Sequence, residues 1–448
     1  MLWHFGGLLS KYRLMKRLFL LSCWFVFCVS GLSADWPFWR GDLAGSGISG
    51  ESDLPTEWGR EKNVKWKVDL PEPGNSTPVI FGDRIFVTQP ISETSMRTLM
   101  CLDRKTGKKL WQKGIKYTKK ERTHRTNHYC SASPATDGDR VIVAHGSAGL
   151  FCYSPDGEEL WKRDFGAIDH VWGSGSSPLI YKDLCIHYYG PGKGAFLVGL
   201  DKNTGKTLWK FDEPDWKPGK RTDGFRGQSD GGIVGSFSTP ILVNSGKRDE
   251  LIMSFPMEMK AFDPSSGKVL WTCEGLNPLV YTSPVYDGKT VVALGGYYGN
   301  SIAVKTGGSG DVTNQRLWQQ VRHHGGIGTG VAKDGFYWFN NSAGIVYCLD
   351  LKTGETKWKE RLPGKGNSWG SFTLVGDKIY SLSQSGETAI FKTSPKKLEV
   401  ISHNVMEEKT NSSISVSDGE LFIRTHKALW CVAEGLVSSS ARSSHFSP

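Results

Sequence analysis

Three residues with metal-binding side chains lie close together in this sequence. His124, His128 and Cys130 carry the imidazole and thiol groups that bind zinc, but a closed zinc site needs a fourth ligand. The surrounding segment does not show the periodicity of a helix, which would place both imidazoles on one face. We therefore predict no metal site from these residues.

Two glycine-rich stretches match catalytic motifs in their letters alone. Residues 366–370 have the spacing of a nucleophile elbow, which requires a strand before the serine and a helix after it. Residues 45–50 match a dinucleotide-binding fingerprint, which requires the same context. Neither stretch joins a predicted strand to a predicted helix, and the chain contains no P-loop. These motifs therefore predict no chemistry.

A repeated pattern of Asp, Gly and Trp supplies the elements that would position functional residues. In residues 201–209, Gly follows Asp after four residues and Trp follows after four more. The apolar run before the Asp is typical of a strand, Asp can accept hydrogen bonds in the turn, and Gly tolerates a positive φ. The pattern predicts a β-hairpin whose Trp is a packing residue. It recurs at Asp103/Gly107/Trp111, Asp263/Gly267/Trp271 and Asp350/Gly354/Trp358, with looser copies ending at Trp161 and Trp318.

A second hairpin precedes each Trp hairpin. Its first strand opens with a Ser-Pro-type sequence, in which Pro stands where it does not break the ladder, and an Asp-Gly or Gly-Asp turn follows. Each unit is thus four antiparallel strands, and repeat spacings of roughly 40–60 residues fit propeller blades. Eight units begin near Ser76, Ser131, Ser176, Ser238, Ser283, Gly330, Ser371 and Ser412.

The two ends of the repeat region complement each other. The eighth unit ends after Trp430 without an outer strand, whereas residues 63–68 resemble an outer strand without inner ones. Pairing the two would close the ring and leave no exposed terminal edge. We predict an all-β, eight-bladed β-propeller of four-stranded antiparallel blades over residues 63–433. Its structural tryptophans are Trp66, Trp111, Trp161, Trp209, Trp271, Trp318 and Trp358.

The chain begins with the composition of a secretory signal peptide. Residues 1–34 contain four basic residues and no acid, then an apolar stretch that is short for a bilayer, then small residues. Met15 provides an alternative start. We expect export to the periplasm or cell surface, with no transmembrane segment in the mature chain. Residues 35–62 are predicted to be an N-terminal extension and residues 434–448 a disordered tail.

Charge and cysteine content narrow the function classes. The formal net charge is +10, and about +6 remains after the signal peptide is removed, without the concentrated basic face of a nucleic-acid binder. Seven cysteines remain, so at least one is unpaired in a monomer. One repeat position accepts only small residues, which predicts packing cysteines rather than disulfides. The residues at that position are Cys101, Cys152, Gly199, Ala261, Cys348 and Cys431.

The repeat resembles a known family. Ser-Ser-Pro, Asp-Gly-x-Val and Leu-Asp-x-x-Thr-Gly-x-x-x-Trp are similar to the pyrroloquinoline-quinone (PQQ) type repeat of quinoprotein alcohol dehydrogenases and of BamB-type outer-membrane-protein assembly factors. The opening at residues 36–41 resembles exported PQQ-like proteins. In the dehydrogenases, the resemblance implies PQQ between a Trp and a disulfide of adjacent cysteines, with calcium and an Asp base. This chain has no Cys-Cys pair and no assignable acidic trio, and Asp230 is the candidate base.

A propeller of this kind gathers functional residues on one face. The loops between blades and the turns between each blade's middle strands surround the central channel there. The long linker 211–236 suits either a functional loop or a tolerated insertion. We predict a ligand-binding face of His124, His128, Trp172, Arg226, Asp230, Tyr281, His323 and Trp369, with His324 beside it. The middle-strand turns add His145, Tyr188, Tyr189, Tyr297 and Tyr298.

The resulting expectation is a binding protein. We predict a monomeric, non-catalytic scaffold without a cofactor or nucleic acid, which holds a protein, peptide or carbohydrate of the cell envelope. The alternatives are a quinoprotein dehydrogenase with PQQ and calcium in the central funnel, and a carbohydrate-active enzyme on the same loops. Fold alone does not decide among them.

Overall fold

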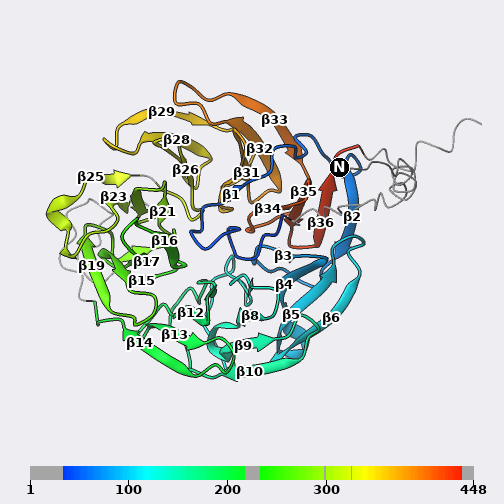
Figure 1. Cartoon of the computed structure of the whole chain (residues 1–448). Helices are drawn as coiled ribbons and strands as arrows, with labels where there is room; N and C mark the ends of the chain where they lie inside the picture. The colour runs from blue at the N-terminus through cyan, green and yellow to red at the C-terminus, as the bar shows by residue number, and fades with distance from the viewer. Residues whose placement is uncertain (1–33, 217–232, 297–298, 324, 436–448) are drawn as a thin grey trace, which may run out of the picture. The chain divides into compact units, whose positions relative to one another are not determined.

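A computed structural model describes residues 34–216, 233–296, 299–323 and 325–435. These residues form β-sheets arranged around a common centre (Figure 1), with three short 3₁₀ turns at Ser92–Thr94, Gly146–Ala148 and Thr313–Gln315. No helix in the described part of the chain is long and apolar enough to cross a membrane. The predicted signal peptide and tail lie outside the described residues, except for residues 34, 434 and 435.

The first four blades follow the chain in order, each with its first strand at the channel. Blade 1 is β3 (Val79–Phe81), β4 (Arg84–Ile91), β5 (Met96–Asp103) and β6 (Lys109–Lys116); blade 2 is β7 (Ala135–Thr136), β8 (Val141–Ala144), β9 (Leu150–Tyr153) and β10 (Glu159–Arg163). Blade 3 is β11 (Leu179–Tyr181), β12 (Leu184–Tyr189), β13 (Phe196–Asp201) and β14 (Thr207–Asp212); blade 4 is β16 (Ile241–Asn244), β17 (Asp249–Phe255), β18 (Glu258–Phe262) and β19 (Val269–Glu274).

The remaining blades repeat this order. Blade 5 is β21 (Val285–Tyr286), β22 (Thr290–Leu294), β23 (Gly299–Lys305) and β25 (Trp318–His323); blade 6 is β26 (Val331–Lys333), β27 (Phe336–Asn340), β28 (Ile345–Asp350) and β29 (Thr356–Arg361). Blade 7 is β30 (Thr373–Val375), β31 (Lys378–Leu382), β32 (Glu387–Lys392) and β33 (Val400–Val405). Three parallel additions are β1 (Ile48–Ser49) on β30, β24 (Gly310–Asp311) on β19, and β15 (Gly235–Ser236) on β20 (Leu279–Val280).

Blade 8 combines the two ends of the repeat region. Its inner strands are β34 (Ser415–Ser417), β35 (Glu420–Arg424) and β36 (Ala428–Ala433), and its outer strand is β2 (Val64–Asp69). β2 pairs antiparallel with β36, with Trp66 opposite Cys431. This pairing confirms the predicted all-β, eight-bladed propeller and its closure.

The repeated Trp joins neighbouring blades. The Trp209 indole of blade 3 donates a hydrogen bond to the Pro264 carbonyl of blade 4 at 3.0 Å. It also lies against Gly267, where an added Cβ would come within 2.4 Å of the ring. Five other copies donate to the next blade at 2.8–2.9 Å: Trp66 to Arg104, Trp111 to Pro155, Trp161 to Lys202, Trp318 to Leu351 and Trp358 to Ser394. The motif Gly is therefore needed for its positive φ and for the Trp of the preceding blade.

Two blades depart from this pattern. Trp271 is fully buried but donates to the Glu250 carboxylate within its own blade, at 2.9 Å. β33 of blade 7 carries no Trp. Trp66 and Trp111 are half-buried rather than buried. Six of the seven repeat Trp indoles therefore donate to the next blade, and Trp271 donates within its own.

The position opposite each Trp requires a small side chain. Gly199 pairs with Trp209, and a Cβ there would lie 2.2 Å from the indole. The cysteines of the repeat occupy the same position, with Cys101 opposite Trp111 and Cys152 opposite Trp161. All seven cysteines of the described chain are buried and free. They pack as small apolar residues, as predicted.

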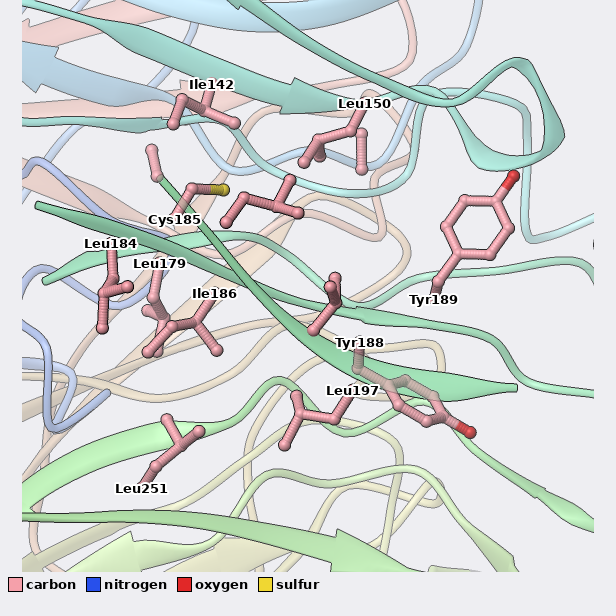
Figure 2. Close-up of a cluster of buried hydrophobic side chains, with 14 of the residues drawn as sticks. Ile142, Leu150, Leu179, Leu184, Cys185, Ile186, Tyr188, Tyr189, Leu197 and Leu251 are labelled. Atoms are coloured by element: carbon pink, nitrogen blue, oxygen red, sulfur yellow. The ribbon is translucent and has the colours of Figure 1, made fainter. Parts of the chain in front are cut away.

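The apolar core lies between the blades. Figure 2 shows Cys185 of blade 3 on the side of Ile142 and Leu150 of blade 2, whereas Ile186 lies on the opposite face of the same sheet. Leu251 of blade 4 continues the same cluster. Because each sheet buries both faces against its neighbours, the inner strands read as nearly continuous apolar runs.

A closed ring of hydrogen bonds joins the eight blades at the channel. Each blade places one Ser or Thr just before its first strand, and its backbone N–H donates to the hydroxyl oxygen of the next such residue. The eight N···O distances are 2.8–3.4 Å, the longest from Ser413 of blade 8 to Thr77 of blade 1. We call these residues the hydroxyl ring: Thr77, Ser133, Ser177, Thr239, Ser283, Thr329, Ser371 and Ser413.

Replacing Thr239 by Val should destabilise the protein by about 1–3 kcal/mol, because the Ser177 N–H then loses its buried acceptor at 3.0 Å while side-chain shape is kept. Equilibrium urea unfolding measures the change. Thr94→Val, which alters an exposed hydroxyl, is the control and should stay within about 0.5 kcal/mol. Equal stability of the two variants would show that the ring does not contribute.

The N-terminal segment before β2 crosses the channel and contacts several blades. Figure 1 shows it in dark blue at the centre, next to β1. Trp36 exchanges backbone hydrogen bonds with Ile80 of blade 1, and Leu43 accepts one from Leu242 of blade 4. β1 pairs with β30 of blade 7. We call residues 35–49 the plug, because they fill the channel on one side of the hydroxyl ring.

Candidate functional site

A cavity of about 290 Å³ opens on the channel. Each of the eight interblade loops contributes to its wall the residue that stands two positions before the hydroxyl ring. Residues two apart on an extended chain face the same side, so these eight residues form a second layer around the channel. We call this layer the upper ring: Asn75, Ser131, Gly175, Phe237, Tyr281, Ile327, Trp369 and Asn411.

One half of the upper ring is apolar. Blades 4 to 7 supply Phe237, Tyr281, Ile327 and Trp369 in succession. Tyr281 stacks on Phe237 with ring centroids 6.0 Å apart, and Trp172 stacks on Tyr281 at 6.2 Å. These half-buried rings form a continuous aromatic surface along one side of the cavity.

The other half of the upper ring is polar and internally hydrogen-bonded. The Asn75 amide donates to the Ser131 hydroxyl at 3.1 Å and to the Thr126 carbonyl at 2.8 Å. The Asn411 amide donates to the same carbonyl at 2.9 Å, and Gln384 donates to the Asn411 amide oxygen at 2.6 Å. This network spans loops of three blades and fixes the orientation of both amides.

Residues behind the aromatic surface hold it in place. The Asn127 amide donates to the Trp172 carbonyl at 2.6 Å. The Trp172 backbone N–H donates to Nδ1 of His170 at 3.2 Å, and the His170 ring meets Trp172 and Phe237 edge-on. Burial lowers the pKa of His170 to about 4, so this ring is neutral at physiological pH. His170 acts here as a packing and positioning residue.

The opposite end of the cavity is closed by the hydroxyl ring and by the plug. Five hydroxyl-ring residues line it, namely Thr77, Ser177, Thr239, Ser371 and Ser413. Trp39 of the plug lines it as well. The buried indole N–H of Trp369 has no hydrogen-bond partner among the described residues. That nitrogen is not accessible from the cavity, so the hydroxyl-ring residues are the polar groups that this end offers beside the aromatic wall.

Four residues of the predicted ligand-binding face line this cavity: His124, Trp172, Tyr281 and Trp369. His124 is held by a 2.6 Å hydrogen bond between Nδ1 and the Thr126 hydroxyl. Arg226, Asp230, Tyr297, Tyr298 and His324 lie outside the described residues, as does the side chain of His323 at the end of β25. That the four lining residues bind a ligand stays a prediction.

The remaining predicted residues lie elsewhere. His128 faces a recess of about 10 Å³, with its ring edge-on to His426 at 5.4 Å. His145, Tyr188 and Tyr189 are buried, because the turns between middle strands pack behind the interblade loops. Burial lowers the pKa of His145 to about 3. These three residues are therefore not exposed on the channel face as predicted, and they serve as core residues.

The Cys130 and His124 side chains have other neighbours in the described chain than the zinc motif would bring together. The Cys130 sulfur lies 3.9 Å from Nδ1 of His145, and His124 bonds Thr126 instead. Within residues 34–435, apart from the segments left undescribed, no three or more His, Cys, Asp or Glu gather in an arrangement that could hold a metal.

The cavity residues that the sequence prediction missed include Trp39, Asn75, Phe237, Ile327 and Asn411. A usable signal exists, because four of them stand two residues before the Ser or Thr that opens a blade. From blade 1 to blade 8, the residue at that position is Asn, Ser, Gly, Phe, Tyr, Ile, Trp and Asn. The polar residues and the apolar residues thus form two continuous groups around the ring. Trp39 has no such signal, since its place depends on the path of the plug.

The eight blades, their Asp–Gly–Trp hairpins and the closure through β2 define a PQQ-like β-propeller. A family model described as "Outer membrane protein assembly factor BamB" matches residues 95–360, which is more than half of the chain. The chain belongs to this family.

The relatives include quinone-dependent dehydrogenases and BamB. Over 119 residues the chain is 31% identical to 1-butanol dehydrogenase (quinone) from Thauera butanivorans, a match that covers 23% of this chain and only 17% of that enzyme. The structure is similar to quinohemoprotein alcohol dehydrogenase from Comamonas testosteroni, with TM-score 0.66, 12% identity, and coverage of 90% of this chain and 81% of that chain.

BamB from Moraxella catarrhalis is similar with TM-score 0.58 and 13% identity, over 84% of this chain and 98% of that chain. A europium-containing methanol dehydrogenase gives TM-score 0.62 and 11% identity, over 87% and 89%. These identities show a shared fold and do not separate an enzyme from a binding protein.

The chemistry of the described cavity wall does not fit PQQ with calcium. PQQ is a planar quinone that carries carboxylates, and calcium prefers oxygen ligands that include carboxylates. Among the 18 described lining residues there is no Asp, Glu, Lys or Arg. No two of the chain's cysteines are adjacent, so the disulfide implied by the resemblance has no counterpart.

Proposed function

We propose that this protein is an exported, non-catalytic binding propeller of the cell envelope, which holds a neutral ligand in the cavity at its channel. The observation that carries the proposal is the composition of the described wall. It combines aromatic rings, amides and hydroxyls, with His124 as its one imidazole and without carboxylates or cationic side chains. Such a wall can bind and orient a molecule, but it supplies little acid–base catalysis.

Two further observations support a binding role. The matching family model is described as an assembly factor, a protein that works through partners. The cavity is held by a hydrogen-bonded network and by a ring of bonds through all eight blades. A rigid frame of this kind lowers the entropic cost of ordering a site when its ligand binds.

The 1-butanol dehydrogenase (quinone) match favours quinoprotein dehydrogenase activity as the second candidate. The two functions separate in one experiment on the full chain. Purified protein is incubated with PQQ and calcium and then desalted, and its absorbance spectrum and its dye reduction with methanol and 1-butanol are recorded beside an authentic quinoprotein dehydrogenase. We expect neither retained PQQ nor activity. Retained cofactor together with activity that is lost in Asp230→Ala would overturn the proposal.

A further inference from the structure

We infer that the ligand of this cavity is a neutral pyranose sugar, held with one face on the aromatic half of the upper ring and its hydroxyls toward the polar half. The inference rests on the proposed binding function and names the chemical class of the ligand. It starts from the division of the upper ring into two continuous arcs rather than from any single residue.

The aromatic arc matches the apolar face of a sugar ring. A pyranose presents axial C–H groups on its faces, and these pack on the faces of Trp and Tyr rings. Trp172, Tyr281 and Phe237 form a stacked run with interplanar angles of 26° and 21°. All three rings line the cavity, so the ring carbons that they expose there can pack against the C–H groups of a sugar.

The polar arc and the hydroxyl ring match the hydroxyl groups of a sugar. Each hydroxyl-ring oxygen accepts an N–H from the neighbouring blade, so its own O–H remains to be donated. Within the described residues none of the eight hydroxyls donates to a protein atom, and five line the cavity. A ligand rich in acceptor oxygens would satisfy these groups.

The lack of cationic side chains in the described wall favours a neutral sugar over an acidic ligand. The described wall has no cationic side chain. A buried carboxylate or phosphate without a cationic partner or a set of hydrogen bonds to its charge costs several kcal/mol. Sugar acids, phosphorylated sugars and acidic peptides are therefore disfavoured relative to an uncharged sugar of the same size.

The shape of the cavity indicates a terminal sugar unit. Its volume of about 290 Å³ is near the lower end of ligand pockets, which span roughly 300–1,000 Å³. Trp39 and the rest of the plug close the channel beyond the hydroxyl ring. A polysaccharide cannot pass through, so the sugar enters from the loop face, either free or as the end of a glycan.

Isothermal titration calorimetry with the full chain tests the inference. The probes are glucose, galactose, mannose and N-acetylglucosamine, with cellobiose as an end-on disaccharide and glucuronate as a charged analogue. We expect saturable binding of at least one neutral sugar and at least about tenfold weaker binding of glucuronate. Stronger binding of a disaccharide than of its monosaccharide would identify a glycan end as the source.

Variants locate the site. Trp172→Ala and Tyr281→Ala should each weaken sugar binding about tenfold or more, since each removes part of the platform. Trp172→Phe, which keeps a ring, should retain part of the affinity and guards against a folding defect. Tyr286→Ala alters the aromatic residue that ends β21 and does not line the cavity, and this variant should bind as the parent protein does.

Three results would overturn the sugar assignment: no binding by any neutral sugar, equal binding of glucuronate, or binding unchanged by Trp172→Ala and Tyr281→Ala. A cavity that instead binds the neutral aromatic compound indole in a Trp172-dependent way would also overturn it, while leaving a binding propeller in place. PQQ retention with dehydrogenase activity would remove both this inference and the proposed function.

Discussion

Replacing Trp209 by Ala is expected to lower the free energy of unfolding by about 3–5 kcal/mol. The indole is 7% exposed, lies against Gly267 of the next blade and donates to the Pro264 carbonyl at 3.0 Å. Its removal leaves a cavity between two sheets that cannot move together without disturbing the ring. Equilibrium urea unfolding followed by circular dichroism measures the loss.

Two companion variants define the cause of the Trp209 effect. Leu208→Ala changes the preceding residue, which is 53% exposed, and should stay within about 0.5 kcal/mol. Trp209→Phe keeps a ring and removes the N–H, so an intermediate loss of about 1–2 kcal/mol is expected. If Trp209→Ala were no worse than Leu208→Ala, the repeat Trp would not be the contact that joins the blades.

Replacing Arg40 by Met should cost about 3–5 kcal/mol. The guanidinium is 2% exposed, and burial lowers the pKa of Arg40 to about 10. All five of its N–H groups donate to backbone carbonyls at 2.6–3.1 Å, two within the plug and three on blades 6 and 7. Met would remove all five of these buried hydrogen bonds, although the Thr329 carbonyl keeps the Phe372 N–H as a donor, and would detach the plug from both blades.

Arg60→Met is the matched control for the Arg40 variant. Arg60 also precedes β2, but its ion pair with Glu407 is 63% and 62% exposed, so its loss should be within about 0.5 kcal/mol. Arg40→Lys should also be strongly destabilising, because an ammonium cannot reproduce the planar fork of donors. Urea unfolding compares the three. Similar midpoints for Arg40→Met and Arg60→Met would contradict the role assigned to the plug.

The fold was predictable because its signals are local and repeated. The Asp–Gly–Trp spacing marks each outer hairpin, and Trp66 marks a strand whose partners are missing nearby in sequence. The motif Gly was predicted from its positive φ, but its second role, leaving room for a Trp, was not predictable from one repeat. Gly267 must leave room for Trp209, which belongs to the preceding blade. A contact between repeats becomes visible only when the blades are placed side by side.

The site was predictable only in part. Interblade loops could be assigned to the channel face, which brought Trp172 and Tyr281 to the cavity. Phe237 and Ile327 look like ordinary apolar residues before a strand, and only the ring geometry places them on the wall. Tyr189 was predicted to be exposed on the channel face, but an interblade loop covers it. Its hydroxyl donates a hydrogen bond to the Gly166 carbonyl of that loop at 2.6 Å.

The plug illustrates a limit of a different kind. Residues 35–62 were predicted as an extension because they precede the repeats and lack their motif. The Arg40 guanidinium reaches the carbonyls of Thr329 and Phe372, 289 and 332 residues further along the chain. No periodic pattern encodes such a contact.

The hydroxyl ring and the upper ring are two residues apart in every interblade loop. One layer is nearly uniform in chemistry because it joins the blades, while the other varies from Asn to Trp. Substitutions in the upper ring can therefore change the ligand preference, one loop at a time, without breaking the hydrogen bonds of the hydroxyl ring. Exchanging residues at these eight positions offers a route to redirect recognition on an unchanged frame.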